Sequence, residues 1–308
     1  MNESALDLVA LGEPLIEFNQ TRRGAPEYLQ GFGGDTSNCA IAAARLGAGT
    51  AYVTRVGSDA FGRLLLDLWR REGVDAQDVA LDPDAHTGVY FVTHGGDGHE
   101  FSYLRTGSAA SRMRPAELPV CVVRAAKVLH VSGISQAISD SACDTVFAAI
   151  DVAREVGSRV SYDPNLRLKL WPLARARAVI RATIPLCDWF LPSLDEMAQL
   201  SGKSEPEAVL DWCHAHGAAL VALKMGADGA WLSTTTMRAH VPGHRVACLD
   251  TTGAGDCFDG AFIARLVAGD APLAAARYAN AAAALKTLGY GAVSPLPRPL
   301  DVTGFLAP

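Results

Sequence analysis

The sequence predicts an α/β fold in which helices cover both faces of a mostly parallel β-sheet. Short apolar runs alternate along the 308 residues with segments of helical periodicity, which is the pattern of βαβ units. The composition is 49% hydrophobic and rich in alanine and valine, as is typical of helices packed on a buried parallel sheet. No long linker, charge block or low-complexity tract interrupts the chain, so we expect a single domain over residues 1–308.

Six apolar runs are predicted to be strands, and each ends in a polar or glycine-containing turn. They cover residues 6–11, 51–56, 128–131, 160–162, 189–191 and 220–223. Helices are predicted over residues 36–46, 59–72, 139–155, 173–183, 206–215, 255–268 and 272–287. Right-handed crossovers place the strand ends along one edge of the sheet, where open α/β sheets bind ligands.

One stretch breaks this alternation. Residues 87–105 have the pattern of a β-hairpin with a glycine-rich turn. Together with residues 16–32 they are predicted to form a small sheet that projects from the main domain as a lid.

Charge and cysteine content restrict the partners and the compartment. A net charge of −6 without a local basic stripe argues against nucleic acid or an anionic membrane as partner. The seven cysteines form no Cys-x-x-Cys pair, which favours reduced thiols over disulfides or zinc. The first residues lack a basic segment and no apolar run reaches the ~18 residues of a membrane span, so we expect a cytoplasmic protein.

The string Asp-Thr-Thr-Gly-Ala-Gly-Asp-Cys-Phe-Asp-Gly at residues 250–260 carries the strongest chemical signal. Gly253 and Gly255 let backbone N–H groups turn toward an anion, and the helix that follows adds the positive end of its dipole. Asp256 then lies where a hydroxyl would approach that anion, an arrangement suited to phosphoryl transfer. The alternative is an ordinary helix entry with Asp256 as N-cap.

Two other phosphate-binding motifs are excluded by single positions. A dinucleotide fingerprint starting at Gly253 would need a third glycine where Phe258 stands. A Walker A loop ending at Gly202, Lys203 and Ser204 would need a glycine in place of Met197.

The eleven-residue string resembles the C-terminal signature of the PfkB (ribokinase-like) carbohydrate kinases, and the resemblance extends over essentially the whole chain. It implies a three-layer α/β/α sandwich with a small β-sheet lid, and ATP, Mg²⁺ and a small sugar as ligands. It also implies that Asp256 is the catalytic base and that the backbone of Gly253, Ala254 and Gly255 forms the anion hole.

Further segments match the family's sugar and nucleotide sites. Within Gly33-Gly34-Asp35-Thr36-Ser37-Asn38, Gly34 and Asn38 are implied to contact the sugar, although a polar turn capping a helix would explain the segment equally well. Within Lys224-Met225-Gly226-Ala227-Asp228-Gly229, the lysine and both glycines are implied to cover the ATP phosphates and ribose; a hairpin turn is the alternative. Asn280 matches a position beside the adenine, or is simply a solvated helix residue.

The chain departs from the family at the magnesium-linked Asn-x-x-Glu motif, which is Ser193-Leu194-Asp195-Glu196 here. Glu196 is therefore the expected organiser of Mg²⁺, through water, whereas Ser193 can be explained as a helix cap. The resemblance also implies a monovalent-cation site, with K⁺ as the ion, formed by Asp250, Thr252 and residues 289–294.

Three segments bear on the sugar. Tyr103-Leu104-Arg105 and Asp163-Pro164-Asn165-Leu166-Arg167 resemble segments of 2-keto-3-deoxygluconate kinases, and Tyr90 matches a substrate-contacting position. Two arginines in one pocket suit an acidic sugar, because a guanidinium binds a carboxylate through two hydrogen bonds. Alternatively, Arg167 faces the ATP phosphates and Arg105 is a charge at the rim.

The expected reaction is therefore transfer of the γ-phosphoryl group of ATP to the terminal hydroxyl of 2-keto-3-deoxygluconate. A kinase for a neutral sugar such as fructose or ribose is the alternative, and a sugar-binding regulator without catalysis is a third reading. The exposed lid is a natural edge for a homo-oligomer.

Overall fold

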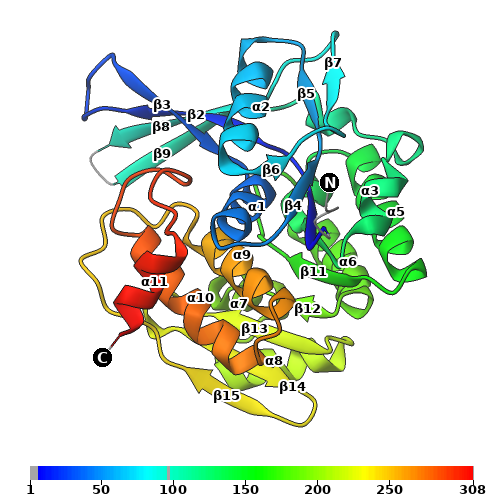
Figure 1. Ribbon diagram of the computed structural model, residues 1–308, viewed down its shortest axis with the longest axis vertical. Helices are drawn as coiled ribbons and strands as arrows, with labels where there is room; N and C mark the ends of the chain where they lie inside the picture. The colour runs from blue at the N-terminus through cyan, green and yellow to red at the C-terminus, as the bar shows by residue number, and fades with distance from the viewer. Residues whose placement is uncertain (1–5, 96–97, 308) are drawn as a thin grey trace.

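The computed structural model describes residues 6–95 and 98–307 and is built on a nine-stranded sheet (Figure 1). The strands are β1 (Leu8–Leu11), β4 (Thr50–Val53), β6 (Val74–Asp75), β10 (Val128–Ser132), β11 (Arg159–Asp163), β12 (Trp189–Phe190), β13 (Leu220–Lys224), β14 (Ala230–Thr234) and β15 (Arg238–Val241). Their order is β15-β14-β13-β12-β11-β10-β1-β4-β6, and every pairing from β13 to β6 is parallel. At the other edge β13, β14 and β15 pair antiparallel.

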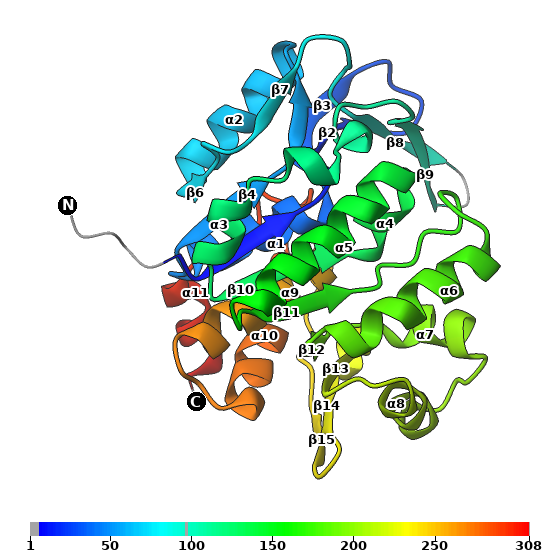
Figure 2. The same cartoon turned by 90° about the vertical axis from the view of Figure 1, so that its right-hand side faces the viewer.

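Helices cover both faces of this sheet, as predicted (Figures 1 and 2). One face holds α1 (Asp35–Arg45), α2 (Ala60–Glu72), α9 (Ala254–Val267), α10 (Pro272–Lys286) and α11 (Pro299–Leu306). The other holds α3 (Val120–Ala125), α4 (Gly133–Ala137), α5 (Asp140–Glu155), α6 (Leu173–Thr183), α7 (Leu194–Ser201) and α8 (Pro206–Ala215). Along β1, Leu8 and Ala10 enter the first core while Val9 and Leu11 enter the second, which is why these strands are apolar throughout.

All six predicted strands are present, but the one at residues 51–56 is divided. Its second half is a separate strand, β5 (Arg55–Gly57), which leaves the main sheet and pairs with β7 (Ala80–Asp82). Between the halves, the Thr54 hydroxyl donates to the Gly12 carbonyl at 2.6 Å. Helices α3, α4, α7 and α11 were not among the predicted elements; all four have eight residues or fewer, too short for a clear apolar stripe.

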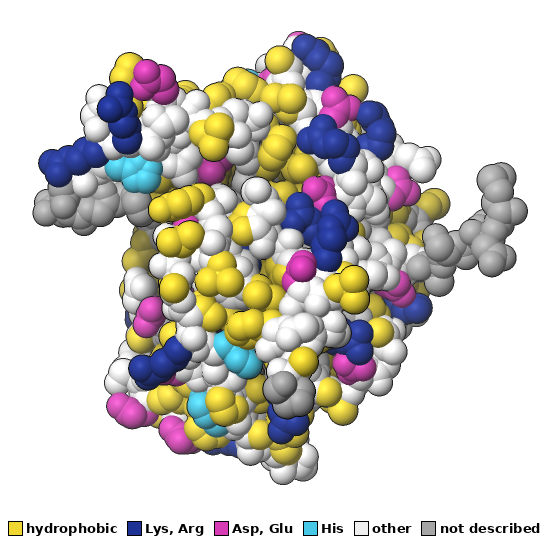
Figure 3. All heavy atoms as spheres, turned by 60° about the vertical axis from the view of Figure 1, so that its left-hand side comes forward, with side chains coloured by type: hydrophobic (Ala, Val, Ile, Leu, Met, Phe, Trp, Pro, Cys, Tyr) yellow, Lys and Arg dark blue, Asp and Glu magenta, His cyan; other side chains and the backbone are white. Residues whose placement is uncertain are grey.

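The predicted projecting sheet also exists, formed by β3 (Tyr28–Gly33), β2 (Leu15–Gln20), β8 (Val89–Gly95) and β9 (Gly98–Leu104) in that order. We call it the small sheet. Its outer pairs are antiparallel, whereas β2 and β8 run parallel. The tip of the predicted glycine-rich turn, residues 96–97, lies outside the described residues. Figure 3 shows the small sheet overhanging one side of the body, on a face where acidic and basic side chains are interspersed.

No helix in the described part of the chain is long and apolar enough to cross a membrane. The edge at which the parallel strands end brings together polar side chains from several strands. Ser132 of β10 and Asp163 of β11 are paired in register there, and Lys224 ends β13 at the same edge. The N-termini of α1 and α9 begin beside them.

The close approach of α1 and α9 gives a test of this packing. A Cβ at Gly260 of α9 would lie 2.4 Å from the Cys39 carbonyl oxygen of α1. Gly260→Ala should therefore lower the free energy of unfolding by about 1–3 kcal/mol, as expected for overpacking. Gly304→Ala in α11, where an added Cβ meets nothing within 4 Å, is the matched control and should be neutral or stabilising by up to ~1 kcal/mol. Urea denaturation measures both, and equal midpoints for the two variants would contradict the contact.

Candidate active site

Helix α9 begins at Gly253, which adopts a left-handed conformation with φ of 75°. A Cβ at this position would lie 3.0 Å from the Ala292 Cβ, so glycine suits both the backbone angle and the space. The helix has no side-chain cap, so Asp256 is not an N-cap and its carboxylate is free for another role. The N–H of Ala254 donates to the Thr251 carbonyl at 3.0 Å.

That last bond bears on the expected anion hole, which stays a prediction. The Ala254 N–H is used within the turn, whereas the Gly253 N–H has no acceptor among the described residues. The Gly255 and Asp256 N–H groups, in the first turn of the helix, likewise have none. They point along the helix axis at the positive end of its dipole, which is a favourable place for a phosphate.

Asp256 is joined to the N-terminus of α1. The side-chain amide of Asn38 donates to Asp256 Oδ2 at 2.8 Å, across 218 residues of sequence. Burial, and next the negative charge of Asp35, raise the pKa of Asp256 to about 7, while the Asn38 hydrogen bond opposes the shift. A carboxyl group with a pKa near neutrality is well matched to accepting a proton from a hydroxyl.

The first turn of α1 presents two buried oxygen atoms that lack a partner. Asn38 Oδ1 and Asp35 Oδ1 are buried, and neither has a hydrogen-bond partner among the described residues. The other oxygen of Asp35 accepts from the Asn165 amide at 3.0 Å. Buried polar atoms are nearly always paired, so these two acceptors indicate a ligand with hydroxyl groups. Sequence reasoning missed Asp35, although it stands in the same glycine-rich segment as Asn38.

The backbone conformation of Gly34 shapes this turn. Its φ is 103°, and a Cβ would lie 2.4 Å from the Glu13 carbonyl oxygen. The segment therefore folds back tightly before α1, and its role toward a sugar stays a prediction.

Lys224 lies behind the anion hole, but its partners are carboxylates. Its Nζ contacts Asp163 Oδ2 at 2.9 Å and both oxygens of Asp259 at 2.9 and 3.1 Å. Burial opposes the charge of Lys224, yet the two carboxylates raise its pKa above the ordinary value. Burial raises the pKa of Asp259, whereas the charge of Lys224 holds the pKa of Asp163 below its usual range against the opposing effect of burial.

The family resemblance implies that Lys224 covers the ATP phosphates and ribose, whereas the structure pairs it with carboxylates. Its ammonium neutralises a buried acidic pair, and a Cβ on Gly255 would lie 3.6 Å from it. Any direct contact with ATP phosphates would have to be shared with Asp163 and Asp259. Asp259 was not recognised from the sequence, since a single acid five residues after the start of an apolar helix has no spacing signal.

Glu196 and Ser193 form a capping box at the start of α7. The Ser193 hydroxyl accepts from the Glu196 N–H at 3.4 Å, and Glu196 Oε2 accepts from the Ser193 N–H at 3.3 Å, which confirms the capping role of Ser193. Glu196 Oε1 accepts from the Leu166 N–H at 3.1 Å and from Arg167 at 3.3 Å. Within the described residues no group of three or more His, Cys, Asp or Glu side chains could hold a metal. A water-mediated contact between Glu196 and Mg²⁺ stays a prediction.

Arg105 is already paired. Its Nε donates to Glu13 Oε2 at 2.8 Å, its Nη2 contacts the same oxygen, and the Ser108 hydroxyl donates to Glu13 Oε1 at 2.6 Å. The arginine side chain is 9% exposed, so it is not a rim charge either. A substrate carboxylate would therefore have to compete with Glu13 for Arg105, and the role of Arg105 toward a substrate stays a prediction.

Arg167 is the more available cation. Its side chain is 49% exposed, and Glu196, its one carboxylate partner in the described part of the chain, is 3.3 Å away. Burial opposes its charge, but Glu196, Asp256 and Asp35 together raise the pKa of Arg167. It therefore lies in the field of the proposed base, with guanidinium surface still open to solvent.

Tyr90 and Tyr103 extend the site into the small sheet. Their rings stack with centroids 5.8 Å apart, and Arg105 lies over the Tyr103 ring at 5.5 Å. The Tyr90 hydroxyl donates to Glu17, and it would lie 2.7 Å from a Cβ on Gly33. Tyr90 is thus beside the glycine-rich segment, with its hydroxyl already engaged, and Tyr103 stacks on it.

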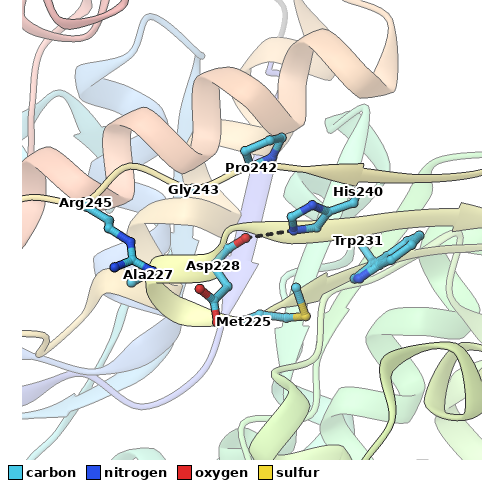
Figure 4. Close-up of a pocket in the computed structure, with 8 residues that line it drawn as sticks. All are labelled: Met225, Ala227, Asp228, Trp231, His240, Pro242, Gly243 and Arg245. Carbon is cyan, nitrogen blue, oxygen red and sulfur yellow. Dashed lines mark hydrogen bonds between the residues drawn. The ribbon is translucent and has the colours of Figure 1, made fainter.

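An open cavity of about 480 Å³ lies beside the β13–β14 turn (Figure 4). Its lining residues are Met225, Ala227, Asp228, Trp231, His240, Pro242, Gly243 and Arg245. Gly226 and Gly229 bracket the same turn, which is a hairpin, as the alternative expected. Asn280 is buried, not solvated: its amide donates to the Val241 and Pro242 carbonyls at 3.0 and 3.2 Å and so fixes one wall of the cavity.

Asp250 and Thr252, expected to hold a monovalent cation, bond to each other. Asp250 Oδ1 accepts from the Thr252 N–H at 2.9 Å and from its hydroxyl at 2.7 Å, and Oδ2 accepts from the Gly291 N–H at 2.8 Å. These bonds lower the pKa of Asp250, although burial opposes them. The Lys286 ammonium donates to the Asp250 carbonyl at 2.9 Å.

Comparison with known proteins places this geometry among sugar kinases. The profile described as pfkB family carbohydrate kinase matches residues 5–299. Fructokinase-2 of Solanum habrochaites is 36% identical over 306 residues, covering 94% of this chain and 93% of its own. The 2-dehydro-3-deoxygluconokinase of Bacillus subtilis is 33% identical over 310 residues, covering 98% and 96%. The structure of fructokinase from Vibrio cholerae with fructose, ADP and calcium ion has 31% identity and a TM-score of 0.89, covering 99% of this chain and all of that one.

The geometry around Asp256 predicts a defined pH dependence. Asp256→Asn should lower kcat by at least about 10²-fold, as for loss of a positioned base, with nucleotide affinity retained. In the unmodified protein kcat/KM should fall as the pH drops through about 7, because the base acts only when ionised. Asn38→Ala should move this limb to higher pH, since the amide stabilises the carboxylate.

Single-turnover rates and pH profiles measure these effects. Asp195→Asn, on the exposed side of the first turn of α7, is the control and should behave like the unmodified protein. Near-normal turnover of Asp256→Asn would remove Asp256 from the role of base.

Proposed function

The chain belongs to the pfkB family of carbohydrate kinases, and we propose that it phosphorylates 2-keto-3-deoxygluconate with ATP at the terminal hydroxyl, giving the 6-phosphate. The family membership confirms the resemblance found in the sequence, and the ribokinase-like α/β/α fold agrees with the solved relatives. The observation that carries kinase chemistry is Asp256, with a pKa of about 7, beside two N–H groups without acceptors at the start of α9.

In this proposal, catalysis depends on the placement of the sugar hydroxyl and on electrostatic stabilisation of the transferring phosphoryl group. Asp256 takes the proton of the sugar hydroxyl as that oxygen attacks the γ-phosphorus, and Asn38 holds the carboxylate in place. The Gly255 and Asp256 N–H groups stabilise negative charge on the transferring phosphoryl group. The unpartnered oxygens of Asp35 and Asn38 accept hydrogen bonds from neighbouring sugar hydroxyls.

The nucleotide is proposed to lie along the β13–β14 turn, with its base in the cavity beside Met225 and Pro242. Gly226 and Gly229 would cover its ribose and phosphates, and Asn280 would act through the wall that it anchors. When bound with ATP, Mg²⁺ neutralises phosphate charge. The lone carboxylate of Glu196 fits a water-mediated contact, since Mg²⁺ commonly keeps several waters and few protein ligands.

Arg167 supports an acidic substrate. Half of its side chain is exposed, and its single carboxylate contact is long, so a substrate carboxylate can bind without displacing a strong partner. The hydroxyl farthest from that carboxylate, at C6, would then reach Asp256. Arg105 and Tyr103 would border the same end of the sugar from the small sheet.

Fructose is the second candidate, and two observations favour it. Arg105 is neutralised by Glu13, which leaves one available arginine instead of two. Several relatives of similar identity are named fructokinases. A regulator without catalysis is disfavoured, because the proposed base and anion hole are intact.

We propose a cytoplasmic location on the basis of the cysteines. All seven are free, and most are buried, as expected in a reducing compartment.

A sugar panel separates the two kinases. Loss of a charge-assisted contact costs about 1.5–3 kcal/mol, so Arg167→Ala should raise KM for 2-keto-3-deoxygluconate about 10- to 150-fold. KM for fructose should hardly change. The measurement is ADP release with Mg-ATP and each sugar, and Arg177→Ala, on α6, is the matched arginine control.

Equal penalties on acidic and neutral sugars, or a raised KM for ATP, would exclude Arg167 as the carboxylate partner. ADP release only with fructose would show that the protein is a kinase for a neutral sugar and would exclude 2-keto-3-deoxygluconate as its substrate. Absence of turnover with every sugar would instead favour the regulator.

The small sheet is proposed to be the lid over the sugar and also the surface that binds a second copy of the chain. Leu29 on β3 and Leu104 on β9 are 70% and 62% exposed, and these are the two edge strands of the sheet. Exposed apolar edge strands readily pair with another chain.

Leu29→Lys combined with Leu104→Lys should therefore shift the protein toward monomer in light scattering. The matched control is Leu300→Lys on α11, which is 86% exposed and remote from the small sheet. An unchanged mass in the double variant, or a monomer at the outset, would contradict this interface.

A further inference from the structure

Lys286 is a fully buried lysine with an unusual partner. It is the last residue of α10, its relative exposure is 0%, and its ammonium donates to the Asp250 backbone carbonyl at 2.9 Å. Lysine is rarely buried without a partner, because removing its charge from water is costly. Because burying Lys286 costs free energy, we expect its ammonium group to have a structural or functional role at this position.

The carbonyl that it contacts belongs to the loop for which family resemblance implies a bound monovalent cation. Such an ion needs several free oxygen ligands, and the structure shows that the oxygens of Asp250 are in use. The Asp250 carbonyl is taken by Lys286, and the Thr287 carbonyl accepts the N–H groups of Leu249 and Asp250 at 2.8 and 3.2 Å. Both carboxylate oxygens of Asp250 accept from Thr252 and Gly291. A K⁺ ion at the Asp250 carbonyl would also lie beside a like charge, so the Asp250 end of this loop does not fit a bound cation.

We propose that the ammonium of Lys286 takes the place of the monovalent cation, so that this chain carries its own fixed positive charge and works without K⁺. The inference rests on the proposed kinase function. The loop tied by Lys286 runs from Asp250 into the anion hole at Gly255 and Asp256. Lys286 therefore fixes the start of this loop through the Asp250 carbonyl, and its charge makes the electrostatic potential at the loop more positive.

Electrostatic coupling within the site agrees with that position. The groups that act on Lys286 include Asp250 and Asp256, and Lys286 in turn acts on Glu17 of the small sheet. Burial lowers the pKa of Lys286, and Asp250 opposes the change. A tethered ammonium pays no entropy of ion binding, so the loop is ordered at any salt composition.

The first test uses the unmodified protein, with ADP release measured in KCl and in choline chloride at matched ionic strength. The two rates should agree within about twofold. Lys286→Ala removes the ammonium and opens space for an ion, so its activity should fall in choline chloride and recover in KCl by about tenfold, within the usual 5- to 150-fold range of such couplings. Lys203→Ala, an exposed lysine after α7, is the matched control and should show neither effect.

A second readout does not depend on turnover. Without substrates, KCl should raise the melting temperature of Lys286→Ala relative to choline chloride, because an ion that binds only the folded state stabilises it. The unmodified protein should melt alike in both salts. This measurement still decides the inference if no sugar proves to be a substrate.

Strong activation or stabilisation of the unmodified protein by K⁺ would overturn the proposal. So would a folded Lys286→Ala that responds to K⁺ in neither assay. If Lys286→Ala does not fold, the two comparisons on the unmodified protein are sufficient.

Discussion

One buried ammonium holds the working edge of this protein together. Lys224, at the end of β13, binds Asp163 at the end of β11 and Asp259 inside α9, so a single charge connects two strands and the helix that carries the base. Removing one partner of a buried ion pair costs about 3–5 kcal/mol, because the other charge is left without compensation. Lys224→Met would leave Asp163 uncompensated behind the anion hole. The position of α9, and thus of Asp256, depends on this cluster.

The rest of the site balances negative charge around that point. Asp35, Asp163 and Asp256 converge on the ends of the strands; the charges of Asp35 and Asp163 raise the pKa of Asp256, and that of Asp163 raises the pKa of Asp35. This crowding, together with burial, brings the pKa of Asp256 to about 7, which suits a base that must accept a proton and later release it. The positive charges of Lys224, Arg167 and Lys286 offset the repulsion among these carboxylates.

The small sheet is attached to the body by similar means. Glu13 follows β1 and binds Arg105, which follows β9, while Glu17 on β2 accepts from Tyr90 on β8. Glu13 is buried and its pKa is raised despite Arg105, so the pair is held at some cost in desolvation. Such a pair suits an element that must keep a defined position over a ligand. Because the pair engages Arg105, Arg167 would be the main residue that distinguishes acidic from neutral sugars.

The sequence by itself determined the parts of this protein that depend on near neighbours. Alternating apolar runs predicted the sheet and most of its helices, and the glycines around residue 255 predicted a helix N-terminus suited to phosphate, with Asp256 at its mouth. The short helices and the bend after β4 were not predictable, because they depend on packing and on single hydrogen bonds such as that of Thr54. Tertiary structure alone decided the partner of each charge. Arg105 binds Glu13 across 92 residues, Lys224 binds Asp163 across 61, and Lys286 reaches the Asp250 carbonyl across 36. An isolated sequence offers each arginine or lysine 33 acidic residues, and only the folded chain brings one or two of them within a few ångströms.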